Sequence, residues 1–232
     1  MKLHAVSFGV LFAIIFLTAQ QLPTKQVEPS PPIPMPADRA ADSYRIYSML
    51  MPVGELGKQG WPHDLWLLAD TTRTMVQPAQ PCNLPSNQDL RVSNPMNPHV
   101  AVHPTPEQTK DFAELLEDFD HNCHVRVILT ANSFNLTVPL HVLTEAEQTE
   151  FRGTRFGPNS RDKADPAVLA KYKGAPGLSS FSEVYFNAHH TVAMVYAEGW
   201  CGGLCANGFW AFFGLEDGQW KPLRWNATFM VS

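Results

Sequence analysis

Four side chains in the C-terminal third of the sequence have the types needed for hydrolysis. Ser182 could act as a nucleophile, Glu183 as an acid, and His189 or His190 as a base. Such a site needs the hydroxyl, the base and an orienting carboxylate within hydrogen-bonding distance. No G-x-S-x-G turn surrounds Ser182, and strand alternation would place Ser182 and Glu183 on opposite faces. A hydrolase using these residues is therefore an alternative hypothesis, and the catalytic residues stay unassigned.

The four cysteines, Cys82, Cys123, Cys201 and Cys205, could form two disulfides. Sequence alone permits three pairings. Cys201 and Cys205 can join only if the chain turns between them, because four extended residues span roughly 13 Å, more than a disulfide accepts. Two glycines lie between them and allow such a turn. We expect Cys201–Cys205 and Cys82–Cys123, and the other two pairings remain open.

Cys201 and Cys205 could alternatively form a thiol–disulfide redox pair. Their spacing is C-x3-C, not C-x2-C, and no cationic side chain lies inside the loop. Reactive cysteines depend on a helix N-terminus or a nearby cation to lower the thiol pKa. The spacing favours a structural disulfide, and redox chemistry is a second alternative.

Two sets of side chains could be imagined as metal ligands: His121, Cys123 and His124, or His189, His190 and Cys201. Neither set has a spacing typical of zinc sites. Adjacent histidines on an extended strand also point to opposite faces. The sequence predicts no metal site and no cofactor.

Aromatic residues are frequent near the C-terminus and could form the floor of a carbohydrate or peptide groove. They are Trp200, Phe209, Trp210, Phe212, Phe213, Trp220 and Trp225. Aromatics at strand spacing are more often core residues. We expect a contact surface where the glycine-rich turn holds Trp200, Leu204 and Phe209.

Four apolar runs from residue 178 onward would position these side chains: SFSEVYFN, TVAMVYAE, GFWAFFGLE and QWKPLRW. Short turns separate them, and Asp217-Gly218 is typical of a two-residue hairpin. Pro222 cannot donate to a strand ladder, so the last run suits an edge. The pattern predicts a four-stranded antiparallel meander.

The N-terminal half alternates helical and strand-like patterns. Helices are expected at 40–51, 105–121, 144–151 and 166–174, and strands at 64–72, 124–132 and 138–144. Thr105 with Gln108, and Thr144 with Glu147, have the spacing of capping boxes. A long loop over 77–104 carries Cys82. Helices of this half packed on the meander would give an α+β fold.

The N-terminus has the layout of a secretory signal peptide over residues 1–20. Lys2 precedes an apolar run that ends at Leu17, and Ala19 stands before polar glutamines. This run is too short for a comfortable membrane span. Residues 21–39 are proline-rich and predict an extended tether, and residues 40–232 a single disulfide-linked domain. We expect export to the periplasm or outside, without a stable membrane span after cleavage.

The charge balance bears on the class of partner. Removing Lys2 from 17 basic side chains leaves 16 against 22 acidic ones, a formal net charge of −6. A nucleic-acid partner would call for a basic face, so this charge balance argues against one.

The composition, with 44% hydrophobic residues, six Trp and 14 Phe, is sufficient for a folded core.

The C-terminal 55 residues resemble a group of uncharacterised exported bacterial proteins. The shared elements are an S-x-V-x-F strand, a C-G-x-L-C-x-x-G segment and a closing G-x-W strand. Here they are Ser182, Val184, Phe186, Cys201, Gly202, Leu204, Cys205, Gly208, Gly218 and Trp220, with Ala206 where a further glycine is expected. The resemblance implies a bacterial envelope location and no particular reaction. The closing DGQWK is also similar to the last hairpin of nuclear-transport-factor-like domains, an alternative α+β fold.

These features favour a non-catalytic binding or interaction module of the cell envelope. Its partner would be an envelope protein or a glycan, not a nucleic acid, bound near Trp200, Leu204 and Phe209. The alternatives are the Ser182/Glu183/His189 hydrolase and the Cys201/Cys205 redox protein.

Overall fold

The computed structural model describes residues 29–51, 64–83, 96–155, 165–203, 205–225, 227 and 230–231. Helices and strands mix in this part of the chain, so the predicted α+β class is confirmed. The proposed signal peptide and the first part of the tether lie outside the described residues. Within the described residues, no helix combines the length and the apolar character that crossing a membrane requires.

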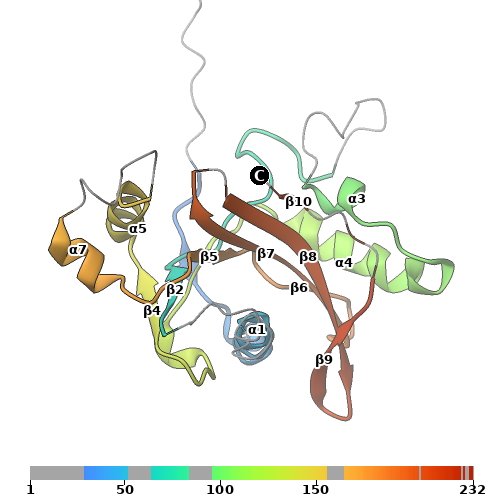
Figure 1. Cartoon of the computed structure of the whole chain (residues 1–232). Helices are drawn as coiled ribbons and strands as arrows, with labels where there is room; N and C mark the ends of the chain where they lie inside the picture. The colour runs from blue at the N-terminus through green and yellow to red at the C-terminus, as the bar shows by residue number, and fades with distance from the viewer. Residues whose placement is uncertain are drawn as a thin grey trace, which may run out of the picture.

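One mixed sheet of eight strands organises the described residues (Figure 1). Its main order is β10-β8-β7-β5-β2-β4, with β6 paired to β7 and β9 to β8. The bounds are β2 Trp66–Ala69, β4 Leu140–Leu143, β5 Leu178–Phe181, β6 Tyr185–Phe186, β7 Val192–Gly202, β8 Cys205–Glu216, β9 Gln219–Leu223 and β10 Met230–Val231. Strand β2 pairs in parallel with both β4 and β5, whereas the other pairs are antiparallel.

The predicted meander is only part of this sheet. Its first run divides into β5 and β6, both paired to β7, and the chain continues antiparallel through β8 and β9. The expectation of a purely antiparallel C-terminal sheet is wrong, because β2 and β4 extend it in parallel. Parallel partners far apart in the chain leave no local pattern comparable to a hairpin turn. The last strand of the predicted meander, β9, pairs with β8 alone among the described strands, as expected for the edge position that Pro222 requires.

Helices cover both faces of the sheet. α1 (Ala37–Leu50) packs Ile46 and Tyr47 on one face, together with Leu68 of β2 and Val195 of β7. α4 (Thr109–Asn122) packs on the opposite face through Phe112, Leu115 and Phe119, the side chains that the sequence predicted. α5 (Glu145–Gly153) and α7 (Pro166–Lys171) lie near β4, at the other end of the sheet from α4 (Figure 1).

The fold begins before residue 40. A short strand, β1 (Ile33–Pro34), pairs in parallel with β3 (Val127–Ile128), and α1 starts at Ala37. The last residues of the expected tether therefore belong to the folded body. Pro36 stands at the N-cap of α1, where a missing backbone N–H costs nothing.

The strand expected at 124–132 is much shorter than its β-branched content suggested. Only Val127–Ile128 is extended as β3, and a 3₁₀ turn, η3 (Ala131–Ser133), follows. The side chain of Thr72 accepts from the N–H of Val127 at 2.8 Å, and Leu129 N donates to Asp70 O at 2.7 Å. This segment thus pairs with the chain leaving β2.

Local patterns at helix ends and turns match the structure closely. Thr105 and Gln108 form a capping box at η2 (Pro106–Gln108), directly before α4, and Thr144 and Glu147 form one at α5. The β8–β9 turn holds Asp217 and Gly218 at positive φ, as a type I′ hairpin requires. In the described part of the expected long loop, a short helix, α3 (Pro98–Ala101), is capped by Asn97.

Candidate functional site

Ser182 is buried and its hydroxyl is fully engaged. It lies between β5 and β6, where Oγ donates to the carbonyl of Glu183 at 2.7 Å and accepts from the N–H of Tyr196 at 2.9 Å. His189 and His190 are exposed on the turn before β7. Among the described residues, no hydrogen bond joins either imidazole to Ser182. The structure therefore does not assemble the candidate Ser–His pair. The hydroxyl instead hydrogen-bonds backbone groups next to β6 and in β7.

Glu183 is a carboxylate in the interior, with 1% of the residue exposed. Its Oε1 lies 3.4 Å from Nη1 of Arg39, and its Oε2 is buried without a hydrogen-bond partner. Burial raises the pKa of Glu183 to about 7; the guanidinium of Arg39 opposes that rise and Asp118 adds to it. Glu183 therefore exchanges a proton in the neutral pH range.

Arg39 connects the two helices that cover opposite faces of the sheet. From α1 it donates to both carboxylate oxygens of Asp118 on α4, at 2.6 and 3.2 Å. It also donates to the carbonyl of Val184, while Asp118 accepts from the N–H of Phe186 at 2.7 Å. The two side chains thus satisfy the outer edge of β6, which would otherwise expose backbone groups to pairing with another chain.

A buried polar layer continues along α1 behind this pair. Ser43 and Tyr47 follow Arg39 at intervals of four residues, so they share one face of the helix. The hydroxyl of Tyr47 donates to Ser182 O at 2.9 Å, and the hydroxyl of Ser43 is buried without a partner. The polar contacts orient α1 on the 182–184 segment.

A surface depression of about 340 Å³ opens beside the Arg39–Asp118 pair. We call it the edge depression; it lies between α1, α4 and the turn after β6. Its charged lining includes Asp38, Arg39, Glu114, Glu117 and Asp118. Four carboxylates against one guanidinium make it electronegative.

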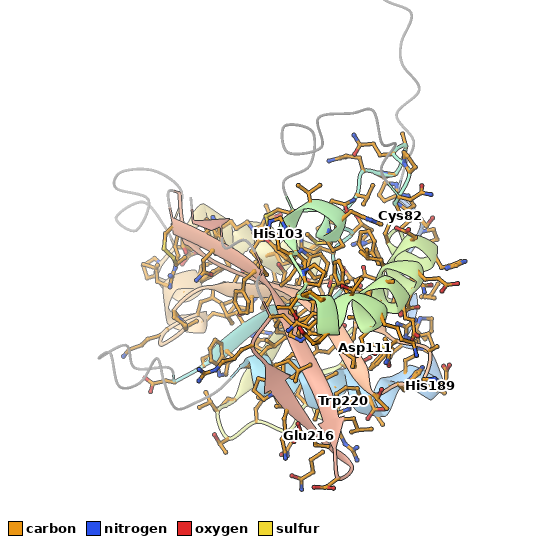
Figure 2. All side chains as sticks on the ribbon, turned by 90° about the vertical axis from the view of Figure 1, so that its right-hand side faces the viewer. Cys82, His103, Asp111, His189, Glu216 and Trp220 are labelled. Carbon is orange, nitrogen blue, oxygen red and sulfur yellow. A yellow bond between two sulfur atoms is a disulfide. The ribbon has the colours of Figure 1, made fainter. Side chains whose placement is uncertain are left out.

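An aromatic wall completes the edge depression. His190, held at φ 52°, stacks its ring on Phe186 with the centroids 4.7 Å apart and the planes almost parallel. The guanidinium of Arg39 also lies 5.2 Å from the centre of the Phe186 ring. His189 lies at the periphery of the molecule (Figure 2). Of the four candidate catalytic residues, His190 is the one that lines the depression, and Glu183 reaches it only through Arg39.

The expected contact surface is divided by the sheet. Trp200 and Phe209 lie on opposite faces of the β7–β8 hairpin. Trp200 points to the same face as Tyr196, whereas Phe209 pairs with Ala197, the next residue on β7, which points to the other face. Trp200 packs against Phe151 of α5, and Phe209 packs against the core on the α1 side. Leu204 lies outside the described residues. Trp200 and Phe209 are therefore half-buried packing residues of two layers.

The structure pairs the cysteines as the loop geometry predicted. Cys82 and Cys123 form one disulfide with Cα atoms 5.9 Å apart, and Cys201 and Cys205 form the other at 5.2 Å. The first is buried, whereas Cys205 is exposed. Arg155 donates to the carbonyl of Cys201 at 3.4 Å, a cationic neighbour that the spacing within the loop could not indicate.

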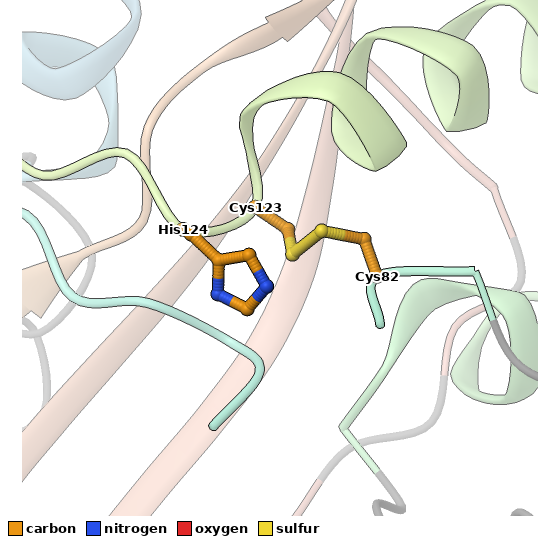
Figure 3. Close-up of side chains that lie close together, drawn as sticks. All are labelled: Cys82, Cys123 and His124. Carbon is orange, nitrogen blue, oxygen red and sulfur yellow. A yellow bond between two sulfur atoms is a disulfide. The ribbon is translucent and has the colours of Figure 1, made fainter. Parts of the chain in front are cut away.

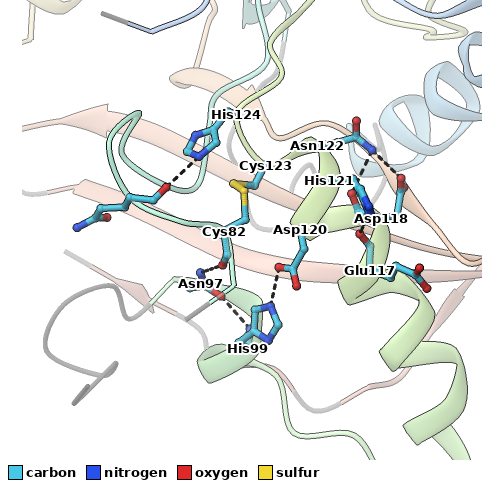
Figure 4. The surroundings of a disulfide bond; sticks show 11 residues. Cys82, Asn97, His99, Glu117, Asp118, Asp120, His121, Asn122, Cys123 and His124 are labelled. Atoms are coloured by element: carbon cyan, nitrogen blue, oxygen red, sulfur yellow. Dashed lines mark hydrogen bonds and ion pairs between the residues drawn. A yellow bond between two sulfur atoms is a disulfide. The ribbon is translucent and has the colours of Figure 1, made fainter. Parts of the chain in front are cut away.

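Three potential metal ligands lie close together beside the buried disulfide. The sulfurs of Cys82 and Cys123 and one ring nitrogen of His124 lie within 4.8 Å of one another (Figure 3). His121, part of the set considered from sequence, is instead hydrogen-bonded through Nδ1 to Glu117 O at 2.7 Å (Figure 4). The sequence-based set did not include Cys82, because Cys82 lies 41 residues before Cys123 in the chain.

The group of Arg39, Asp118 and Glu183 was not predicted. The three residues come from α1, α4 and the 182–184 segment, and Arg39 was assigned to the tether.

Comparison of the chain with protein-family models, with curated proteins and with solved structures found no match.

Proposed function

We propose that the protein is a non-catalytic binding module of the cell envelope that recognises a cationic group in the edge depression. The observation that carries the proposal is the placement of Asp38, Glu114, Glu117 and Asp118 around one recess. Among the described residues, Asp118 is the one of these four carboxylates that forms an ion pair, with Arg39. The remaining negative potential favours an ammonium or guanidinium ligand and steers its approach.

The fixed geometry of the recess supports binding. Asp118 is held by Arg39, by the N–H of Phe186 and by Asn122 Nδ2, the last at 2.7 Å. Glu114 accepts from the N–H of Ala188 at 3.2 Å. Carboxylates that are already oriented lose little further freedom when a ligand binds. The exposed ring of His190, stacked on the buried Phe186, offers a flat surface for the stem of a lysine or arginine side chain.

A basic segment of an envelope protein is the ligand that this chemistry fits. The two disulfides and the absence of a membrane-crossing helix among the described residues are compatible with export. The secretory layout of residues 1–20 supports the same compartment. The net negative charge favours a basic protein partner over a nucleic acid.

A set of short lysine- and arginine-containing peptides tests the proposal by fluorescence anisotropy. The probe is the tightest peptide found, compared with the same peptide carrying acetylated lysines or citrullines in place of arginines. We expect Glu114→Gln/Glu117→Gln to weaken binding at least tenfold. The matched control, Glu145→Gln/Glu216→Gln, removes the same charge from exposed sites elsewhere and should change affinity less than twofold.

Two results would refute the proposal. Equal weakening by both double variants would show that only the net charge attracts the peptide. Equal affinity for the neutralised peptide would show that the cationic group is not recognised.

Thiol–disulfide exchange at Cys201–Cys205 is a second candidate, favoured by Arg155. Its guanidinium donates to the backbone at Ala175, Pro176 and Cys201, beside the exposed Cys205. A nearby cation stabilises a thiolate leaving group. In the reaction, two thiols of a partner give two electrons and two protons to the Cys201–Cys205 bond and leave as a disulfide.

A reduced dithiol peptide tests this candidate. Its oxidation should require Cys201 and Cys205, persist in Cys82→Ala/Cys123→Ala, and slow several-fold in Arg155→Gln. Oxidation no faster than with free oxidised glutathione would exclude it.

A further inference from the structure

We infer that Cys82, Cys123 and His124 form a binding site for one thiophilic cation of the Zn²⁺ class when the Cys82–Cys123 disulfide is reduced. The inference does not depend on the edge depression, which lies elsewhere on α4. It rests on three ligand side chains gathered at the C-terminal end of this helix, as Figure 3 shows.

The donor set matches zinc chemistry. Two cysteine sulfurs and one imidazole nitrogen make a Cys₂His set, which leaves a fourth tetrahedral position open to water or another ligand. Around one zinc ion, sulfurs bound at about 2.3 Å lie roughly 3.7 Å apart. The three donor atoms lie within 4.8 Å of one another, and after reduction side-chain rotations must move the two sulfurs apart from their bonded distance to that spacing.

The state of the His124 ring supports a ligand role. Its Nε2 lies 2.9 Å from the carbonyl of Gln80, which accepts a hydrogen bond and so favours the tautomer with the proton on Nε2. In that tautomer Nδ1 carries a free electron pair, and Nδ1 is buried without a hydrogen-bond partner. A histidine that donates one N–H to a backbone carbonyl is the usual arrangement beside a metal. A buried electron pair without a donor is costly. In Figure 3 it is Nε2 that lies on the cysteine side of the ring, so the imidazole turns about its Cβ–Cγ bond to present Nδ1 to a cation held by the two sulfurs.

The surrounding backbone also favours a cation. Cys123 is the C-cap of α4, where the unpaired helix carbonyls concentrate negative potential. Cys82 is held by Asn97, whose Nδ2 donates to the carbonyl of Cys82 at 3.1 Å (Figure 4). Asn97 is itself fully buried at the start of α3. Besides the disulfide, the hydrogen bond between His124 Nε2 and Gln80 O joins the two segments that carry Cys123 and Cys82.

The switch between the two forms is a balanced reaction. A dithiol reductant transfers two electrons and two protons to the bond between the two Sγ atoms and leaves as a cyclic disulfide. The two thiols then lose their protons to solvent as the divalent cation binds both thiolates. The oxidised form cannot ligate in this way, so metal affinity reports the redox state of the chain.

Cobalt(II) is the spectroscopic probe, and the background is the full chain carrying Cys201→Ser/Cys205→Ser, which leaves one cysteine pair. The protein is reduced with a phosphine and then desalted without oxygen. The disulfide oxidises the phosphine, which takes its oxygen atom from water, and the same two thiols form. We expect one equivalent of Co²⁺ to bind with thiolate-to-cobalt charge-transfer absorption. The unreduced protein should show none.

Histidine variants separate the assembled site from a bare thiol pair. His124→Ala should weaken Co²⁺ binding at least tenfold, whereas the control His121→Ala, from the same segment, should leave it unchanged. Absence of the charge-transfer band after reduction, or equal affinity of both variants, would overturn the inference.

Near-ultraviolet circular dichroism covers the case in which reduction unfolds the chain. If the reduced, metal-free protein loses its aromatic signal, Co²⁺ should restore that signal together with the charge-transfer band. Cobalt bound without recovery of the aromatic signal would also contradict the inference, because the site would not be part of the fold.

Discussion

Arg39 and Asp118 form a two-point ion pair that ties a helix on one face of the sheet to a helix on the other. The pair closes around the edge of β6, where its members also bond the backbone of Val184 and Phe186. Glu183 lies behind it in the interior. Stability, pH response and the shape of the edge depression therefore share one set of contacts.

Replacing Arg39 by Met should strongly destabilise the protein. The change leaves the carboxylates of Asp118 and Glu183 without their cation and removes a donor to Val184 O. Breaking a buried pair by removing one partner costs about 3–5 kcal/mol. Urea denaturation measures the loss. Arg45→Met, on the same helix but with a side chain 64% exposed, should cost less than about 0.5 kcal/mol, and a comparable loss in both variants would contradict the role of the pair.

Stability should fall as the pH rises through the neutral range because of Glu183. Its pKa is raised, chiefly by burial, from 4.5 to about 7, so the folded state keeps a proton that the unfolded state has released. The free energy of unfolding should therefore decrease between pH 4.5 and 7, by about 3 kcal/mol at most for this shift. Urea denaturation at several pH values should show a flatter profile for Glu183→Gln. Parallel profiles for the two proteins would refute the assignment.

The two disulfides should contribute unequally to stability. Cys82 and Cys123 are 41 residues apart, whereas Cys201 and Cys205 are four apart. The chain-entropy model gives about 4 and about 2 kcal/mol, respectively. Thermal unfolding of Cys82→Ala/Cys123→Ala and Cys201→Ala/Cys205→Ala should rank them in that order. A greater loss from the short loop would mean that native contacts, and not loop closure, dominate.

Gly177 should not tolerate a side chain. A Cβ built there would overlap the backbone carbonyl oxygen of Trp200, on the neighbouring strand β7. Because the obstacle is backbone, Gly177→Ala must shift β7 near its disulfide, at a cost of about 1–3 kcal/mol. Gly153→Ala is the control, since nothing lies within 4 Å of its added Cβ. Equal melting temperatures for both variants would show that the strand end adjusts freely.

The sequence alone determined those features whose causes lie within a few residues. Thr105 and Thr144 cap helices because a side-chain oxygen meets a backbone N–H three residues ahead. Asp217-Gly218 turns the chain because those residues tolerate positive φ. The Cys201–Cys205 pairing was expected because two glycines let the chain turn within four residues, but the sequence left the other two pairings open and the structure decided between them.

Only the tertiary structure decided the sheet and the sites. The parallel pairing of β2 with β4 and β5 joins segments far apart in the chain, and Arg39 meets Val184 across 145 positions. Such contacts are selected by the joint burial of several faces, which no local pattern encodes. The same holds for Trp200 and Phe209, which are close in the hairpin but face opposite layers. Strand alternation separates neighbours, and packing brings together residues that the sequence keeps apart.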